Sequence, residues 1–254
     1  MAWTFALETV ILIDMDTRAR QRTAQEVSDF YESEGRMFSS KRGRPWNLMD
    51  LIVQKTKPGD TLIDMGAGNG RLFDVLPANI NYLGVEPSQA LRQQAEAKNG
   101  GRPNFKIISG GLPQVDLPDQ CADLVACVAV LHHVPSEEWR RRSIQEMHRL
   151  LKPGGWLVCA VWNLRARRFF SWQTFKYAWL RAVGVPGGDG GDLYYAWKAG
   201  SRPEKRYVHA YTPLEYKADF DAKLWAIENI GAYDLSGWCH WFKGRNLVAV
   251  VQKK

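Results

Sequence analysis

The sequence has few cysteines, and none are spaced as metal ligands usually are. Among its 254 residues there are four cysteines, at positions 121, 127, 159 and 239. None of them forms a Cys-x-x-Cys pair, and no histidine–cysteine spacing resembles a zinc site. We therefore predict no metal. Cys127 and Cys159 lie in apolar runs and are expected to be core thiols. The pattern suits the reducing cytosol and predicts a cytoplasmic protein.

Long apolar runs are also missing. The strongest run near the N-terminus is Val10-Ile11-Leu12-Ile13, far short of the roughly 20 residues that span a bilayer. The segment carries Glu8 and lacks the basic start and small-residue cleavage site of a signal peptide. We predict no membrane partner. Because ordinary soluble helix sequence follows Met15, we hypothesise that translation starts there.

The chain shows no internal repeat and no clear domain boundary. Its length suits one large α/β domain with an elaboration, or at most two small domains. Hydrophobic residues make up 45% of the chain, which is enough to bury a full core. The formal net charge of +7 favours acidic partners such as nucleic acid, without establishing one.

Short apolar strands alternate with helical patterns through the middle of the chain. Strands are expected at Thr61–Asp64, Asn81–Glu86, Phe105–Ile108, Leu124–Val130, Trp156–Trp162, Leu224–Tyr233 and Asn246–Gln252. Helices are expected at Arg18–Glu34, Pro45–Lys55, Arg71–Leu76, Ser88–Lys98, Ser136–Leu150 and Pro213–Ala222. This alternation predicts an α/β fold with right-handed crossovers, a mostly parallel seven-stranded sheet and helices on both faces.

The alternation breaks after Trp162. An aromatic and basic helical stretch is expected at Leu164–Val183, a glycine-rich segment at Gly184–Gly191 and a loop at Leu193–Tyr211. We therefore divide the chain into a helical cap (1–58), a sheet core (59–163), an insertion on the substrate side (164–212) and a closing helix and strands (213–254).

A glycine-rich loop follows the first predicted strand directly. It reads Asp64-Met65-Gly66-Ala67-Gly68-Asn69-Gly70. Glycine permits positive φ and lets a ligand approach the backbone closely, and open α/β sheets bind ligands at the edge where this loop lies. Such a loop also occurs in nicotinamide-binding domains. Glu86 ends the second strand, where an acid can accept hydrogen bonds from both hydroxyls of a ribose.

With Cys121–Val125 before the fourth strand and Leu150–Gly155 before the fifth, this set resembles the class I S-adenosylmethionine-dependent methyltransferases from about Thr61 to Trp162. The resemblance implies a Rossmann-like, doubly wound fold with S-adenosylmethionine as cofactor. The implied cofactor-binding residues are Asp64, Gly66, Ala67, Gly68, Gly70, Glu86, Gly110, Leu112 and Ala129. Gly111 stands where many members have an acid that meets adenine, so backbone groups and Leu112 would recognise that base.

Further short segments point to a narrower family. They are Lys41–Trp46, Val130–His133, Glu137–Arg141, Val161–Trp162, Gly191–Trp197 and Arg206–Tyr211. In this order they resemble the methyltransferases that esterify 5-carboxymethyluridine at the wobble position of tRNA, from about Gln25 onward. The resemblance implies tRNA as partner. Eukaryotic members also work with a small activating protein.

The expected reaction needs no general base, because a carboxylate is already ionised at neutral pH and needs mainly alignment. Substrate positioning is assigned to Arg42, His132, His133, Arg206 and His209, since arginine binds a carboxylate through two parallel hydrogen bonds. Trp46, Trp162 and Trp197 could stack on an unpaired base, although Trp46 and Trp162 are expected in the core rather than at a stacking surface. Arg42 could equally be a solvated surface charge, and either histidine of the His132–His133 pair could only pack under the cofactor.

Two alternatives to this function stay open, and the role of the insertion is also open. The same core serves many small-molecule methyltransferases, and a degenerate cofactor-binding protein could act by interaction alone. The basic residues of the insertion, such as Arg165, Arg168 and Lys176, alternate with aromatic ones such as Phe169 and Trp172. Such a mixture suits RNA contact, a lid helix or a protein interface.

Overall fold

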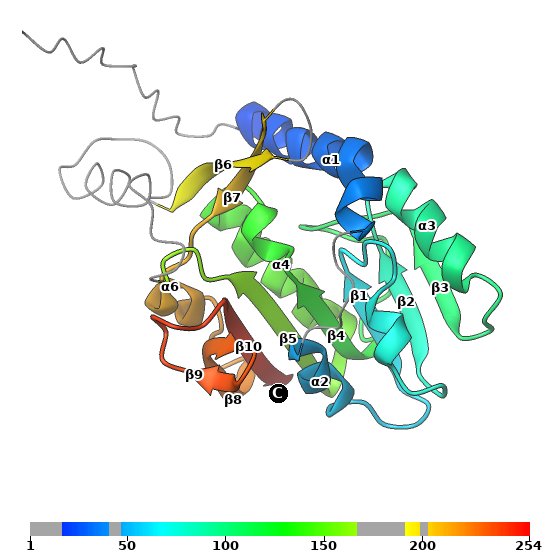
Figure 1. Cartoon of the computed structure of the whole chain (residues 1–254). Coiled ribbons are helices and arrows are strands. Elements are labelled where there is room, and N and C mark those ends of the chain that lie inside the picture. The colour runs from blue at the N-terminus through cyan, green and yellow to red at the C-terminus, as the bar shows by residue number, and fades with distance from the viewer. Residues whose placement is uncertain (1–16, 41–46, 167–190, 199–202) are drawn as a thin grey trace, which may run out of the picture.

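The computed structural model describes residues 17–40, 47–166, 191–198 and 203–254. The proposed start at Met15, Arg42, Trp46 and the helical stretch from residue 167 onward lie outside the described residues, as does the side chain of Trp197. Figure 1 shows one central sheet with helices packed on both of its faces. Among the described residues, no helix has the length and apolar character needed to cross a membrane.

The central sheet has the strand order β3-β2-β1-β4-β5-β10-β8-β9. Its parallel half consists of β1 (Thr61–Met65), β2 (Asn81–Val85), β3 (Phe105–Ile108), β4 (Ala122–Val128) and β5 (Leu151–Trp162). The remainder consists of β8 (Trp225–Asp234), the short edge strand β9 (Gly237–Cys239) and β10 (Asn246–Lys253), which runs antiparallel between β5 and β8. The predicted mostly parallel sheet is confirmed, and β9 is an eighth strand beyond the seven expected.

Alternate residues of each strand face opposite sides of the sheet, and both sides are buried. On one side Ile63 and Cys127 belong to a core with α4 (Glu137–Leu150) and α6 (Pro213–Ala218). On the other side Leu62 and Ala126 belong to a core with α2 (Leu48–Val53), η1 (Leu72–Val75) and α3 (Gln89–Asn99). The doubly wound arrangement therefore holds, and Cys127 and Cys159 are fully buried as expected.

The prediction of an α-helix at Arg71–Leu76 is wrong. These residues form the single 3₁₀ turn η1, with i to i−3 bonds such as Asp74 N to Arg71 O at 3.2 Å. Pro77 follows at once, and a residue before proline is disfavoured in the helical region. The segment is thus too short for a helix. The helix predicted at Pro213–Ala222 also ends early, at Ala218.

The loop predicted at Leu193–Tyr211 is also wrong. The chain forms an antiparallel hairpin of β6 (Asp192–Lys198) and β7 (Pro203–His209), separate from the main sheet. The hairpin has its own small core, in which Leu193 and Val208 pack with Leu164. Its strands are rich in tyrosine, tryptophan and valine, which favour β structure. The sequence between the two strands contains no Asn-Gly or Asp-Gly pair, the two-residue turn motifs that most strongly mark a hairpin.

The long helix α1 (Thr17–Ser40) packs against both α3 and β7. The sequence predicted it over Arg18–Glu34. Glu32 of α1 accepts hydrogen bonds from Ser88 Oγ at 2.8 Å and from the Ala90 backbone at 3.1 Å. A carboxylate is favourable at a helix start, so α1 is attached to the beginning of α3. Figure 1 shows α1 and the hairpin side by side, next to the carboxyl ends of the parallel strands.

Candidate functional site

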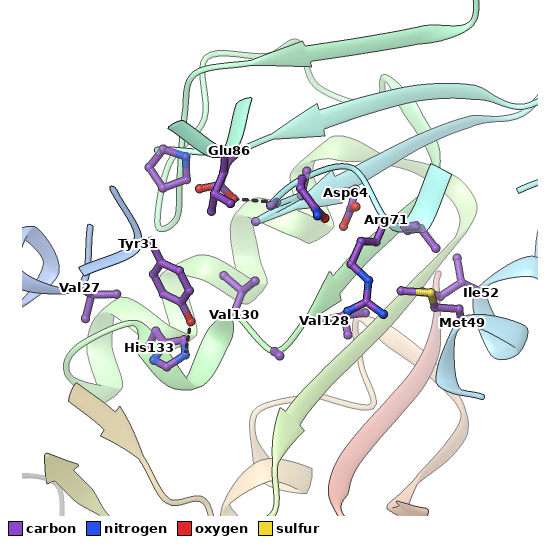
Figure 2. A pocket seen from close by; sticks show the side chains of 18 of the residues that line it. Val27, Tyr31, Met49, Ile52, Asp64, Arg71, Glu86, Val128, Val130 and His133 are labelled. Atoms are coloured by element: carbon purple, nitrogen blue, oxygen red, sulfur yellow. Dashed lines mark hydrogen bonds between the residues drawn. The ribbon is translucent and has the colours of Figure 1, made fainter. Parts of the chain in front are cut away.

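A cavity of about 1080 Å³, counting space open to solvent, lies at the carboxyl ends of β1, β2 and β4. Seven of the residues predicted for the site line it: Asp64, Gly66, Ala67, Gly68, Glu86, Ala129 and His133. Figure 2 shows Glu86 and Asp64 on one side of the cavity, and Tyr31 and His133 on another.

The glycine loop has the backbone that only glycine adopts easily. Gly66 has φ +70° and Gly68 has φ +57°, both in the left-handed region. A Cβ added at Gly66 would lie 2.3 Å from Val130 Cγ2, whereas one added at Gly68 would meet nothing within 4 Å. Gly66 therefore allows close packing of the loop on Val130, and Gly68 leaves open space in the cavity.

The Glu86 carboxylate is held by backbone groups on both sides. Gly68 N donates to Oε2 at 2.8 Å and Ser88 N donates to Oε1 at 2.9 Å. The side chain is only 5% exposed, and burial raises the pKa of Glu86 despite these two bonds. Each carboxylate oxygen keeps a further lone pair. The arrangement places a fixed acceptor at the cavity wall, which suits a diol such as a ribose.

Asp64 is buried at the end of β1 and accepts a hydrogen bond from Tyr82 OH at 2.8 Å. Burial raises the pKa of Asp64 to about 7, and the nearby Glu86 charge adds to the rise, against the bond from Tyr82. Tyr82 is itself fixed by stacking on Phe105, with ring centroids 5.3 Å apart. The cavity floor therefore carries two carboxyl groups that repel each other's ionised form.

Ala129 follows β4 with φ +60°, an uncommon value for a residue with a side chain. Its backbone N–H donates to Ala160 O of β5 at 2.8 Å, which fixes the strained turn. Ala129 and Val130 both line the cavity. The turn thus brings the end of β4 against the glycine loop.

Three predicted cofactor residues lie in the described part of the chain but do not line the cavity: Gly70, Gly110 and Leu112. Gly70 has φ +74° and packs closely on Ala95 of α3. Leu112 packs against the core beneath the sheet edge. Their part in binding the cofactor stays a prediction.

A chain of hydrogen bonds forms the wall of the cavity that lies across from Glu86 and Asp64. Arg206 Nη1 donates to Tyr31 OH at 2.8 Å, and Tyr31 OH lies 3.0 Å from His133 Nε2 (Figure 2). His133 Nδ1 lies 2.9 Å from the Tyr207 carbonyl oxygen, which can only accept. In the neutral ring, His133 Nδ1 therefore carries the proton and Nε2 accepts from Tyr31.

Arg206 lies behind this wall, 1% exposed, rather than in the cavity. Its guanidinium carbon is 4.8 Å from the ring centroid of Trp162, 4.9 Å from that of Phe30 and 5.4 Å from that of Tyr31. Aromatic faces stabilise a cation at such distances. Trp162, expected in the core, lines the cavity with its ring. A buried positive charge thus stands directly behind an aromatic wall.

The other two histidines of the prediction lie away from the cavity. His132 is fully buried and packs on Trp162, with ring centroids 4.6 Å apart. His209 lies between Asp192 Oδ1 at 2.7 Å and Glu215 Oε1 at 2.6 Å. Burial raises the pKa of Glu215, but the bond and charge of His209 outweigh it and bring the value to about 2. His209 therefore joins the hairpin to α6.

Two cavity residues escaped the sequence analysis. Tyr31 lies within the helix predicted at Arg18–Glu34 but was given no role in the site, and its contact with His133 joins positions 102 apart. Arg71 follows the glycine loop directly, lines the cavity and is half-buried, so burial lowers its pKa. Its guanidinium points toward Met49 and Ile52 of α2 (Figure 2). A cation directly after a glycine loop was the available signal for Arg71.

The described residues contain no group of histidine, cysteine or acidic side chains that could hold a metal ion. The cavity offers the glycine loop, a fixed carboxylate, the Arg71 cation and an aromatic wall with Arg206 behind it. These groups can bind a nucleoside-like ligand and an anion side by side.

The chain matches the family described as "Methyltransferase domain" over residues 63–159. It is 31% identical over 220 residues to the tRNA (carboxymethyluridine(34)-5-O)-methyltransferase of Schizosaccharomyces pombe, covering 84% of this chain and 93% of that one. It is 29% identical over 170 residues to "Probable tRNA methyltransferase 9B" of Bos taurus. That match covers 66% of this chain but 36% of the bovine protein, so the chain spans about a third of its length.

Among solved structures, the chain resembles a Haloferax volcanii methyltransferase in complex with the Trm112 methyltransferase activator. The TM-score is 0.61 at 16% identity, with 89% of this chain and 97% of that one covered. A likeness at this identity extends to the fold alone. It agrees with the α/β fold described above.

Proposed function

Because the chain belongs to the methyltransferase family that includes the S. pombe enzyme, we propose that it methylates the carboxylate of 5-carboxymethyluridine at the tRNA wobble position. The product is a methyl ester. One observation carries the choice of substrate: the match extends over 220 residues, whereas the family domain spans only residues 63–159. It therefore necessarily includes chain outside the common cofactor core.

The residues of the cavity fit S-adenosylmethionine. Glu86 would hold the ribose hydroxyls, because its carboxylate is fixed by Gly68 N and Ser88 N. Gly68 leaves open space for close approach to the backbone. Arg71 is the cation suited to the carboxylate of the methionine part. When bound, S-adenosylmethionine supplies an electrophilic methyl group.

On the acceptor side the protein has to align and attract an anion rather than remove a proton. Arg206 supplies a permanent positive charge behind Tyr31 and Trp162. His133 in the tautomer derived above accepts from Tyr31, so it orients that wall and does not act as a base. Trp162 borders this wall and packs against the Arg206 guanidinium. Arg42 keeps its predicted role in binding the carboxylate as part of this proposal.

The test is methyl transfer to defined RNA. Purified protein with labelled S-adenosylmethionine should methylate tRNA that carries 5-carboxymethyluridine, and should leave tRNA with unmodified uridine at that position unlabelled. Mass spectrometry of tRNA nucleosides from a deletion strain of the source organism should show loss of the methyl ester. Unchanged wobble nucleosides in that strain would reject the tRNA assignment.

A small molecule is the second candidate acceptor. The cavity wall is largely apolar, with Val27, Leu91 and Val130 among its residues, which suits a compact ligand as well. Comparing turnover on the free 5-carboxymethyluridine nucleoside with turnover on tRNA separates the two candidates. Similar kcat/KM values for both would favour the small-molecule function.

We include a small activating protein and a cytoplasmic location in the proposal. The Haloferax neighbour was solved with such an activator. Activity of the purified chain alone, set against activity with fractions of a cell extract, tests the need for a partner. Cell fractionation tests the location.

A further inference from the structure

Exposed aromatic side chains gather on residues 235–245, which we call the β9 platform. Trp238 is 38% exposed, Trp241 39% and Phe242 41%. Lys243 and Arg245 are exposed beside them. Single exposed apolar residues are ordinary on protein surfaces. Three large exposed rings followed directly by two cations within eight residues are not, and the mechanism proposed above uses none of them.

The platform lies at the same edge of the sheet as the cavity. Asn246, which follows it, pairs in register with Trp162, whose ring lines the cavity. Asn163 Nδ2 donates to Trp241 O at 2.6 Å and to Gly244 O at 3.0 Å. Asn47, directly before α2, donates to Leu235 O. The platform is thus bonded to two segments that border the cavity.

The platform is also held in one conformation. Lys243 N donates to His240 O at 2.8 Å, which closes a turn around Trp241 and Phe242. A Cβ added at Gly244 would lie 2.6 Å from the Cβ of Ala232, so the loop backbone packs tightly on β8. The Trp241 and Phe242 rings meet edge to face, with centroids 4.4 Å apart. The rings are presented on a firm base rather than on a free loop.

Aromatic faces with nearby cations are the chemistry that binds single-stranded nucleic acid, because every base has a stacking face and every linkage a negative charge. Arg245 is partly neutralised by Asp234 at 3.0 Å, which leaves Lys243 as the main cation there. We propose that the β9 platform stacks unpaired bases of the tRNA anticodon loop next to the nucleotide that enters the cavity. This inference rests on the tRNA function proposed above.

The experiment measures steady-state kinetics of the full chain on an anticodon stem-loop RNA that carries 5-carboxymethyluridine, and on the free nucleoside. The test variant combines Trp241→Ala with Phe242→Ala. A second variant, Trp241→Phe with Phe242→Tyr, keeps the stacking faces. Leu224→Ala is the matched control, because Leu224 is 45% exposed next to Trp225, which pairs with Lys253 at the opposite edge of the sheet.

The alanine variant should raise KM for the RNA between about five- and a hundred-fold, as loss of base stacking does. Its turnover on the free nucleoside and its affinity for S-adenosylmethionine should stay within twofold of wild type. The aromatic variant and Leu224→Ala should match wild type. RNA carrying 4-thiouridine beside the wobble position should photo-crosslink to residues 238–243.

An unchanged KM for the RNA in the alanine variant overturns the inference, including the case in which the platform proves to bind a protein. If wild-type protein methylates no RNA either alone or with the fractions of cell extract used to test for an activating partner, the tRNA function itself fails. If wild type methylates RNA and the alanine variant does so equally well, only the platform fails. The two results are therefore distinguishable in one set of assays.

Discussion

The two walls of the cavity are built in opposite ways. On the wall proposed to hold the methyl donor (the donor wall), Gly68 and Glu86 are 18 positions apart and meet through one strand and one loop. On the wall proposed to hold the methyl acceptor (the acceptor wall), Arg206 and Tyr31 are 175 positions apart and meet through α1 and the hairpin β6–β7. The donor wall is a local motif. The acceptor wall exists only once distant elements have packed together.

Because of this difference, changes in sequence affect the two walls differently. A local motif keeps its geometry as long as β1, β2 and their loop are intact. The acceptor wall depends on the packing of α1 on the hairpin, so changes there can alter the substrate without touching the donor wall. Many substrates on one fold follow naturally from such a division.

The largest effect is expected at the donor wall, from Gly66→Ala. The new Cβ would collide with Val130 Cγ2 and sit at φ +70°, and strain and overpacking each cost about 1–3 kcal/mol. Gly68→Ala carries only the strain, since its Cβ has open space. Urea unfolding should show a clearly lower midpoint for Gly66→Ala than for Gly68→Ala; equal midpoints would contradict the packing argument.

A tenfold or greater loss of S-adenosylmethionine affinity is expected from Glu86→Gln. The change removes a charged acceptor, and hydrogen bonds to charged groups contribute about 1.5–3 kcal/mol. Calorimetric titration measures the dissociation constant. Glu96→Gln on the exposed side of α3 is the control and should bind as wild type does. Equal affinity of both variants would mean that Glu86 does not contact the cofactor.

A smaller effect, confined to the acceptor wall, is expected from Arg206→Lys. Lysine keeps the charge but loses the planar group that packs on Trp162 and Phe30. The value of kcat/KM for tRNA should fall about tenfold, or about 1.4 kcal/mol, at unchanged cofactor affinity. Arg141→Lys, at a side chain 60% exposed, serves as the control. A parallel loss of cofactor affinity would show that the two walls are not independent.

A change in the pH dependence of stability is expected from Asp64→Asn, which can keep its bond to Tyr82. The folded pKa of Asp64, about 7, lies above its ordinary value of 3.8. Folding therefore favours the neutral acid, and this stability is present below pH 4 and lost as pH rises through 7. The variant should lose less stability across this range in thermal unfolding. Asp116→Asn, at an exposed site, should keep the wild-type slope.

The donor wall could be predicted from the sequence because its signals are local. Gly66 and Gly68 of the glycine loop, Glu86 at the end of β2 and Ala129 after β4 were all expected in the site, and all line the cavity. Each depends on residues a few positions away, and the hydrophobic pattern of parallel strands fixes where those strands end.

The acceptor wall could be predicted only in part. His133 was expected there and lines the cavity. Tyr31 also lines it, but the sequence placed Tyr31 only within a helix. Arg206 was expected in a loop and lies on a strand, where the pleat directs it toward Phe30 and Trp162. Which distant segments meet depends on tertiary packing, which the local spacing of residues does not contain.

The position of β10 has a consequence for how the protein assembles during synthesis. Of the main-sheet strands it is the latest in chain order, yet it lies between β5 and β8. While the ribosome is still making residues Asn246–Lys253, β8 has no partner through which to join β5. The parallel half can form first, but the β9 platform reaches the cavity only after this strand inserts. Nascent chains should therefore acquire the donor wall before the surface proposed to receive the RNA.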